Sequence, residues 1–207
     1  MGISAFGASG IKPGVCTSTT RPTAPYEGMM IYETDTDMVA LWNGSAWRYI
    51  AATTPTNGTV LQIQTTNKTD TFSYTGTTYT DVTGLSVSIT PKSSSSKIFV
   101  MAMVSGTGAT GLTNFFGRLV RDSTALLVGD AASTRTQATI AQGSQNYPAT
   151  MPIMYLDSPA TTSSTTYKIQ IRAQSATTVY INRASDDSDN GATPRTASTI
   201  TVMEIAA

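Results

Sequence analysis

The chain has 207 residues, of which 40% are hydrophobic and 13% are charged, and its 13 Lys and Arg residues balance 13 Asp and Glu residues. A neutral chain whose basic residues are scattered singly has no electrostatic reason to bind nucleic acid or an anionic membrane. The sequence contains no histidine, which removes the commonest general base and a common metal ligand. No run approaches the roughly 20 apolar residues of a membrane-spanning helix. We therefore expect neither nucleic acid nor a membrane span, and no cofactor.

Residues 1–20 are rich in glycine and serine and contain only isolated apolar residues. Such a segment has neither a helical nor a strand period, and alone it would be disordered. It is either a floppy terminus or an extended arm that becomes ordered on a partner. In the second case the attachment residues are Ile3, Phe6, Ile11 and Val15. The single cysteine, Cys16, cannot form an intrachain disulfide. It is expected to be a buried or unmodified thiol; the alternative is a disulfide between copies in a symmetric oligomer.

Residues 21–50 predict a small module of three short β-strands that follows a proline-containing connector. The runs MMIYET, MVALW and AWRYI are strand-like, and the Asn43-Gly44 pair between the last two is typical of a hairpin turn. A three-stranded meander of this size has little core of its own. Its cover would come from other copies of the chain or from the following domain. We therefore interpret Trp42 and Trp47 as packing residues at a subunit interface.

Residues 51–58 contain Pro, Asn and Gly and indicate a linker. From residue 59 to 207, nine strand-like runs recur with turn signals between them, and Thr is abundant on these strands, as is typical of sheet surfaces. This pattern predicts a β-sandwich of the jelly-roll type. The predicted fold class is therefore all-β, with a small N-terminal three-stranded meander followed by the sandwich.

The strand expected over residues 97–106 is apolar on both faces. Ile98, Val100, Ala102 and Val104 alternate with Phe99, Met101 and Met103, so both faces should be buried. In a two-layer sandwich only one face meets the core, and methionine suits an irregular contact surface. Phe99, Met101 and Met103 therefore predict a subunit interface; the alternative is a loop of the same chain that covers them.

Polar loops are the remaining candidates for contact with a ligand. The stretch ASDDSDNG at residues 184–191 suggests a calcium loop, but Ala197 stands where the bidentate glutamate of such a loop belongs, so a solvated loop is the preferred interpretation. No nucleophile–base motif, carboxylate pair or phosphate loop was found, so no catalytic activity is expected. The candidate receptor-facing residues are Thr107, Thr110, Asp186, Asp187, Asp189 and Asn190.

Two parts of the sequence resemble known proteins. The stretch TRPTAPYEGMMIYETDTDMVALWNGSAW is similar to a short module of tailed-bacteriophage structural proteins, with its R-P-x-x-P connector and its Y-x-T-D-T and W-N-G-x-x-W motifs. The runs YLDSPATTSSTTYKIQI, TVYINRASDDSDN and STITVMEIAA resemble a C-terminal domain of phage tail-fibre and virion proteins, especially of phages that infect cyanobacteria and other aquatic bacteria. Together the two resemblances cover approximately residues 20–207.

The resemblance implies a non-catalytic, homotrimeric structural protein on the virion surface. Members of the family differ in their attachment point, and we expect the apolar residues of the N-terminal arm to dock this chain to the particle. Its partners would be other copies of itself, a tail protein or the major capsid protein, and a host surface glycan or protein. One function is a tail fibre or receptor-binding protein; the alternative is a capsid decoration (cement) or head-fibre protein. A depolymerase is disfavoured because no β-helix repeat is present, and a lectin-like module remains a further alternative.

Overall fold

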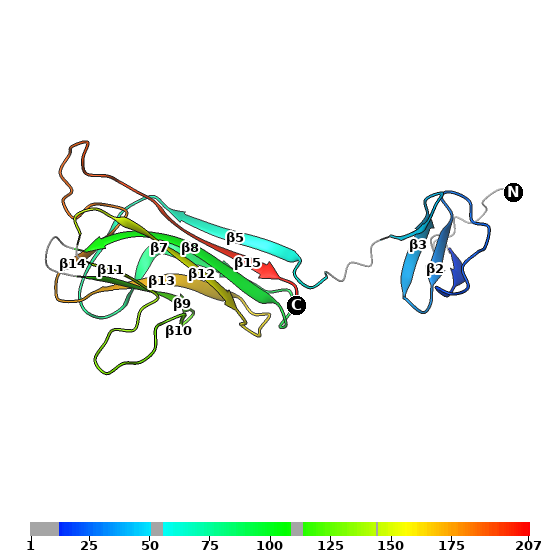
Figure 1. The fold of residues 1–207 in the computed structure, drawn as a ribbon, viewed down its shortest axis with the longest axis horizontal. Helices are drawn as coiled ribbons and strands as arrows, with labels where there is room; N and C mark the ends of the chain where they lie inside the picture. The colour runs from blue at the N-terminus through cyan, green and yellow to red at the C-terminus, as the bar shows by residue number, and fades with distance from the viewer. Residues whose placement is uncertain (1–12, 51–55, 109–113, 144) are drawn as a thin grey trace. The chain divides into compact units, whose positions relative to one another are not determined.

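A computed structural model of the chain describes residues 13–50, 56–108, 114–143 and 145–207. The described residues form strands and connecting turns without any helix, so the predicted all-β class is confirmed (Figure 1). The chain divides into two compact units, Met1–Thr54 and Pro55–Ala207. The division falls within the expected linker, of which residues 51–55 lie outside the described residues.

The N-terminal unit is a four-stranded sheet in the order β1-β2-β3-β4. Its strands are β1 (Gly14–Cys16), β2 (Met30–Glu33), β3 (Met38–Trp42) and β4 (Trp47–Tyr49). Strands β2, β3 and β4 form the expected antiparallel meander. The expectation of three strands was incomplete, because β1 pairs in parallel with β2. The extended arm predicted for residues 1–20 therefore does not reach residue 20, since its residues 14–16 belong to the sheet.

The hairpin between β3 and β4 has the chemistry that its sequence predicted. Gly44 adopts a φ of 91°, a left-handed conformation that glycine accepts without a steric cost. The Asn43 side-chain Oδ1 accepts hydrogen bonds from the backbone N–H groups of Ser45 at 3.1 Å and Ala46 at 2.8 Å. These local bonds fix the turn and bring Trp42 directly opposite Trp47.

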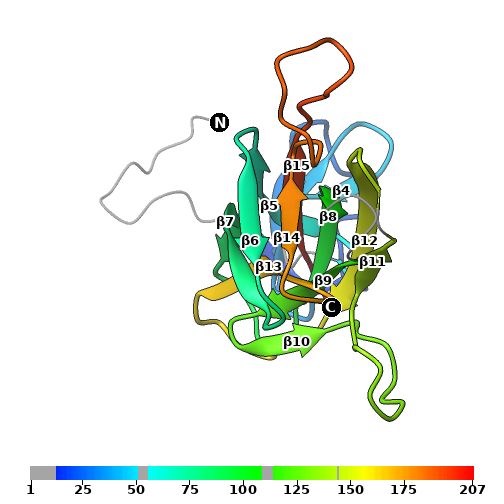
Figure 2. The same cartoon turned by 90° about the vertical axis from the view of Figure 1, so that its left-hand side faces the viewer.

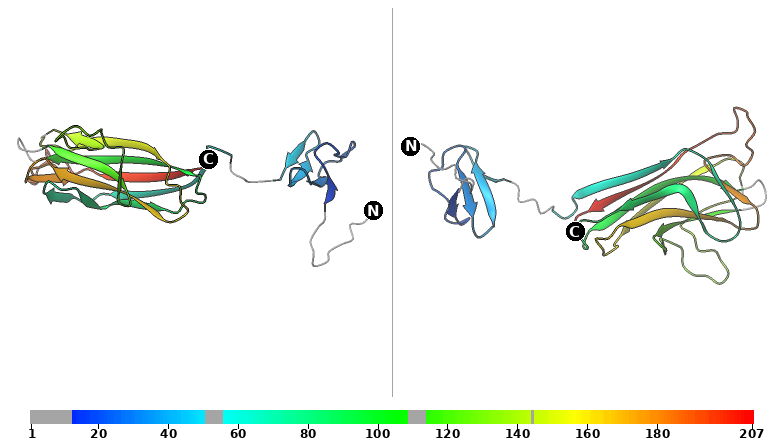
Figure 3. Two further views of the ribbon diagram at one scale, coloured as in Figure 1. Left: turned by 90° about the horizontal axis from the view of Figure 1, so that it is seen from below. Right: turned by 180° about the vertical axis from the view of Figure 1, so that it is seen from behind.

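The second unit is a sandwich of two antiparallel sheets (Figures 2 and 3). One sheet has the order β5-β15-β8-β14-β6, with β12 also paired to β8; the other has the order β10-β9-β13-β7, with β11 also paired to β9. The first contains β5 (Val60–Lys68), β6 (Phe72–Thr75), β8 (Lys97–Gly108), β12 (Ala149–Asp157), β14 (Thr178–Ile181) and β15 (Ser198–Ile205). The second contains β7 (Thr80–Ile89), β9 (Phe115–Arg121), β10 (Thr124–Leu126), β11 (Ile140–Gln142) and β13 (Thr165–Ala173).

The core lies between the two sheets and is built from alternate residues of the long strands. Tyr167, Ile169 and Ile171 of β13 and Ile98 and Val100 of β8 are fully buried. Period-two alternation in each strand sends these side chains inward and their neighbours outward. One face of the first sheet therefore packs in the core, and the other face points away from it.

A buried polar cluster joins the two sheets near one end of the core. The carboxylate of Asp157 on β12 accepts two hydrogen bonds from Arg121 on β9, at 2.8 and 2.7 Å, and one from the Tyr167 hydroxyl at 2.7 Å. Asp157 is 4% exposed. Burial and this bond raise the pKa of Tyr167 above its ordinary value. Arg121 and Tyr167 thus provide the hydrogen bonds that the buried carboxylate of Asp157 requires.

Candidate functional site

Part of the outer face of the first sheet is an uncharged surface made by four adjacent strands, and Lys97 of β8 lies beyond its edge, opposite Ile205. Cross-strand partners on an antiparallel sheet point to the same side, and the pairing of β12, β8, β15 and β5 places their outward residues in three rows. We call this surface the methionine face. Its rows are Pro152–Met103–Thr199–Asn67, Met154–Met101–Thr201–Thr65 and Leu156–Phe99–Met203–Ile63. None of these side chains is ionisable.

Large apolar side chains on the methionine face are open to solvent in the single chain. Met101, Met103, Met154, Leu156 and Ile63 are 40%, 51%, 62%, 55% and 54% exposed. A depression of about 220 Å³ lies between β12, β8 and β15 and is bordered by these methionines, Pro152 and two threonines. Contiguous apolar surface of this kind marks interaction sites on soluble proteins. The described residues therefore provide no loop that covers this face.

The structure brings the three predicted interface residues of β8 onto this surface, with Phe99 half-buried beside the exposed Met101 and Met103. It adds four apolar residues that the sequence interpretation did not use: Met154 and Leu156 of β12, Met203 of β15 and Ile63 of β5. The signal for β12 was present, because Met151 and Ile153 alternate with Pro152, Met154 and Leu156. The placement of Met203 and Ile63 on the methionine face follows from the strand order, and no local sequence pattern predicts that order.

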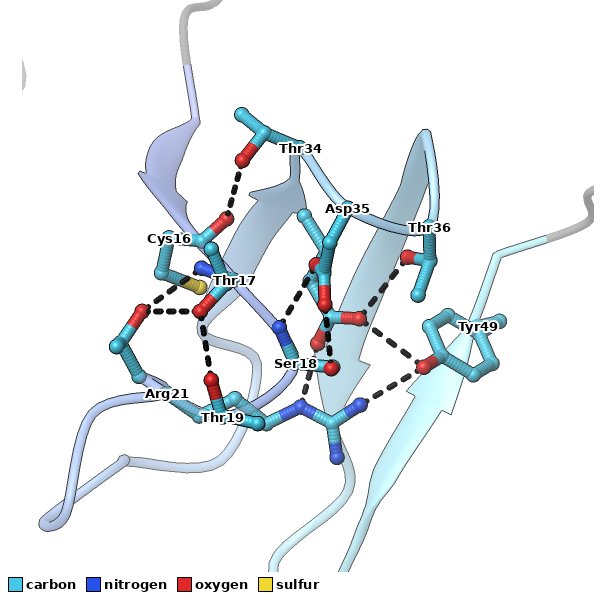
Figure 4. A network of polar contacts seen from close by, with 11 residues as sticks. Cys16, Thr17, Ser18, Thr19, Arg21, Thr34, Asp35, Thr36 and Tyr49 are labelled. Carbon is cyan, nitrogen blue, oxygen red and sulfur yellow. Dashed lines mark hydrogen bonds and ion pairs between the residues drawn. The ribbon is translucent and has the colours of Figure 1, made fainter.

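The N-terminal unit is held together by a polar network rather than by a large apolar core (Figure 4). Ile31 and Ala40 are its buried apolar residues, at 1% and 0% exposure, and the Glu33 side chain is equally buried. The Glu33 carboxylate is ion-paired with Arg21 and accepts hydrogen bonds from Tyr49 at 3.0 Å and Thr36 at 3.1 Å. The Arg21 hydrogen bond holds the pKa of Glu33 below its ordinary value, and Tyr49 and Thr36 act in the same direction.

A second contact ties the segment after β1 to the turn after β2. The Asp35 carboxylate accepts hydrogen bonds from the Ser18 backbone N–H at 2.8 Å and from the Ser18 hydroxyl at 2.5 Å, as Figure 4 shows. These bonds hold the pKa of Asp35 below its ordinary value. The segment after β1 therefore belongs to the folded unit through the side chains of Ser18 and Arg21.

Trp42 and Trp47, predicted as interface residues, form a cross-strand pair. Their rings meet edge to face, with centroids 5.5 Å apart and an interplanar angle of 61°, a favourable geometry for aromatic pairs. Both are half-buried, so the structure shows them as packing residues within the unit. A role between subunits stays a prediction.

Of the predicted attachment residues, only Val15 falls within the described residues. It lies in β1 opposite Tyr32 and is 57% exposed. Ile3, Phe6 and Ile11 lie outside the described residues, so their role in attachment stays a prediction. Cys16, the neighbour of Val15, is a half-buried free thiol.

One of the candidate receptor-facing residues was placed wrongly. Thr107 lies in β8, not in a loop, and is 0% exposed; its hydroxyl donates to the Gln145 carbonyl oxygen at 2.6 Å. The strand extends to residue 108 because β14 pairs with its last residues, a long-range contact that the glycine-rich sequence did not reveal. Thr110 lies outside the described residues.

The remaining candidates, Asp186, Asp187, Asp189 and Asn190, lie in an exposed loop after β14. Asp187 is paired with Arg183 at 3.1 Å and Arg195 at 2.6 Å, so two guanidinium groups already neutralise it. Asp186 accepts hydrogen bonds from the Ser188 N–H and hydroxyl at 3.0 Å. The loop is thus organised by its own ion pairs and turn bonds, which favours the interpretation as a solvated loop.

Two other kinds of site are absent from the described ranges. No group of His, Cys, Asp and Glu side chains there could hold a metal ion. No helix in the part of the chain that the structure describes is long and apolar enough to cross a membrane. In comparisons with known proteins, no family model matches this chain, and no curated protein matches it.

Proposed function

We propose that this chain is a structural protein of a tailed-bacteriophage particle that assembles with copies of itself through the methionine face. The observation that carries the proposal is the exposed, uncharged surface of β5, β15, β8 and β12. The resemblance of both parts of the sequence to phage virion proteins supplies the biological setting and the expected trimer. The function in this setting is mechanical and adhesive rather than catalytic.

A second copy of the chain is the occupant that fits this face best. The absence of charge in the three rows means that two such faces can approach without desolvating an ion, which is the main cost of a polar interface. Methionine side chains adapt to irregular contacts, and the threonines of β15 already hydrogen-bond within the sheet, Thr201 with Thr65 and Thr199 with Asn67. The buried core of homo-oligomer interfaces is commonly apolar, and in a trimer one such face from each copy can pack around the threefold axis.

The N-terminal residues are proposed to attach the trimer to the particle. Because β1 and the Arg21–Glu33 pair belong to the folded unit, the attachment segment is the part that precedes residue 13. We place the particle-bound trimer on the tail as a fibre or receptor-binding protein. Capsid decoration, the alternative, uses the same assembly and differs only in the protein to which residues 1–12 bind.

Two measurements test this proposal. Native mass spectrometry of the purified chain should give three times its mass of 21.8 kDa, and a monomer at micromolar concentration would contradict it. Antibody labelling of intact particles, viewed by electron microscopy, should mark the tail; labelling of the head would instead establish the decoration alternative. A variant that lacks residues 1–12 should remain trimeric and lose its place on the particle. Particles without any label would refute the virion assignment.

A further inference from the structure

The outer face of the second sheet contrasts with the methionine face, because it carries cations and aromatic rings. The pairing of β13 with β9 places Gln170 opposite Arg118 and Arg172 opposite Phe116. Arg118 and Arg172 are therefore diagonal neighbours on adjacent strands, a spacing of about 7 to 8 Å between backbone positions. Both side chains are half-buried.

Both guanidinium groups are held against the same aromatic ring. The Arg118 guanidinium carbon lies 4.1 Å from the centroid of the Tyr79 ring, and that of Arg172 lies 5.9 Å from it. Arg172 also lies 5.8 Å from the centroid of the Phe116 ring. The Tyr79 hydroxyl donates to the Gln137 carbonyl oxygen at 2.8 Å, which fixes the ring. Cation–π contacts of this kind orient the guanidinium planes.

The hydrogen bonds of these arginines use only one edge of each guanidinium. Arg118 Nε donates to Gln170 Oε1 at 2.8 Å, and Arg172 Nε donates to the Ala173 carbonyl oxygen at 3.1 Å. Among the described residues, neither arginine forms a salt bridge, and their terminal NH₂ groups have no hydrogen-bond acceptor. Terminal guanidinium nitrogens are the donors that bind carboxylate and phosphate oxygens.

The carboxylate of Asp81, on the adjacent strand β7, is engaged by other donors. The register of β7 against β13 shifts between Lys168 and Gln170, which places Asp81 opposite Gln170. Asp81 then accepts hydrogen bonds from Lys168 at 2.8 Å and Gln170 at 2.6 Å. Gln170 thus stands between Asp81 and Arg118: its amide N–H donates to Asp81, and its amide oxygen accepts from Arg118. The Asp81 carboxylate is paired with Lys168; the charge of Arg118 also helps to lower the pKa of Asp81, but neither Arg118 nor Arg172 forms an ion pair with it.

We propose that Arg118 and Arg172 form a binding site for an oxyanion, either a free inorganic anion or the acidic group of a saccharide. Two like charges fixed side by side repel each other, and an oxyanion between their terminal nitrogens removes this repulsion and accepts the unused hydrogen bonds. Arginine forks match the planar carboxylate and the tetrahedral phosphate or sulfate geometry. The site differs from the predicted receptor-facing loops and does not depend on self-assembly.

Isothermal titration of the full-length protein with polygalacturonate and, separately, with inorganic phosphate tests the site and separates the two sources. The expected result is saturable binding of at least one probe by the wild-type protein. Arg118→Gln and Arg172→Gln should each weaken it about tenfold, which corresponds to the loss of a charge-assisted hydrogen bond. Arg48→Gln is the matched control, because Arg48 is exposed in the N-terminal unit and forms no salt bridge there.

Far-UV circular dichroism and native mass spectrometry of each variant show whether a change in binding comes from a change in folding or in assembly. If Arg118→Gln disturbs the packing of Tyr79, Arg172→Gln alone decides the outcome. Absence of binding to both probes, equal binding by wild type and both variants, or an equal loss in Arg48→Gln would overturn the proposal. A monomeric wild-type protein that binds polygalacturonate would refute the assembly proposal and leave this one standing.

Discussion

A charge placed at the centre of the methionine face should disrupt self-association without unfolding the chain. Met101 occupies the middle row, between Met154 and Thr201, and 40% of its surface is exposed in the single chain. Full burial of a methionine side chain contributes about 2 kcal/mol, so covering the exposed part of Met101 contributes about 1 kcal/mol. An aspartate at this position would lose that contribution and would also bury an unpaired carboxylate, which costs about 3 kcal/mol.

The sum of about 4 kcal/mol per interface predicts a dissociation constant about a thousandfold higher for Met101→Asp. Sedimentation equilibrium measures it, and circular dichroism should show an intact sandwich, because the substituted side chain points away from the core. Leu127→Asp is the matched control: Leu127 is also an exposed apolar residue, at 48%, but lies outside the methionine face with a φ of 48° that aspartate tolerates. An unchanged dissociation constant for Met101→Asp, or an equal change for Leu127→Asp, would refute the reasoning.

Two further predictions concern the polar contacts. Because the pKa of Glu33 is lowered in the folded unit, its stabilising effect is present above the ordinary glutamate pKa of about 4.3 and is lost as the pH falls through the lower folded value. Tryptophan fluorescence, which reports only on the N-terminal unit because both tryptophans lie there, should show unfolding in acid, and Glu33→Gln should reduce this pH dependence; a flat profile in wild type contradicts it. In the sandwich, Asp157→Ala leaves Arg121 partly buried without its partner and should destabilise the fold by about 3 kcal/mol, measured by urea unfolding; a loss below about 1 kcal/mol would show that water replaces the carboxylate.

The long strands of the sandwich could be predicted from the sequence because their signal is local. Alternation in Thr165–Ala173 and the apolar run of Lys97–Gly108 define β13 and β8 without knowledge of their partners. Two of the short strands could not be recognised in the same way. Strands β6 (Phe72–Thr75) and β11 (Ile140–Gln142) exist because β14 and β9 pair with them, and these contacts are distant in sequence.

The methionine face could be predicted only where the residues of one strand show by themselves that both of its faces are apolar. The apolar outer residues of β8 indicated a second buried face, but the breadth of the methionine face follows from the order β5-β15-β8 and the pairing of β12 with β8. The same limit applies to the N-terminal unit. A carboxylate buried beneath an arginine twelve residues earlier, as in Glu33 and Arg21, leaves no periodic pattern, since both residues are of a type usually found on the surface.

The two outer faces of the sandwich explain how the two proposed roles can coexist in one small unit. An exposed apolar sheet face is an aggregation hazard unless a specific partner covers it. The charged side chains Arg118, Lys168 and Arg172 lie on the opposite sheet, where an approaching copy would have to desolvate them at a large cost. In the proposed assembly, copies would therefore meet through the methionine face, and the half-buried arginine pair would stay accessible on the opposite side. Repetition of that weak anion site in each copy would then raise the avidity for a repeating acidic polymer without a new contact.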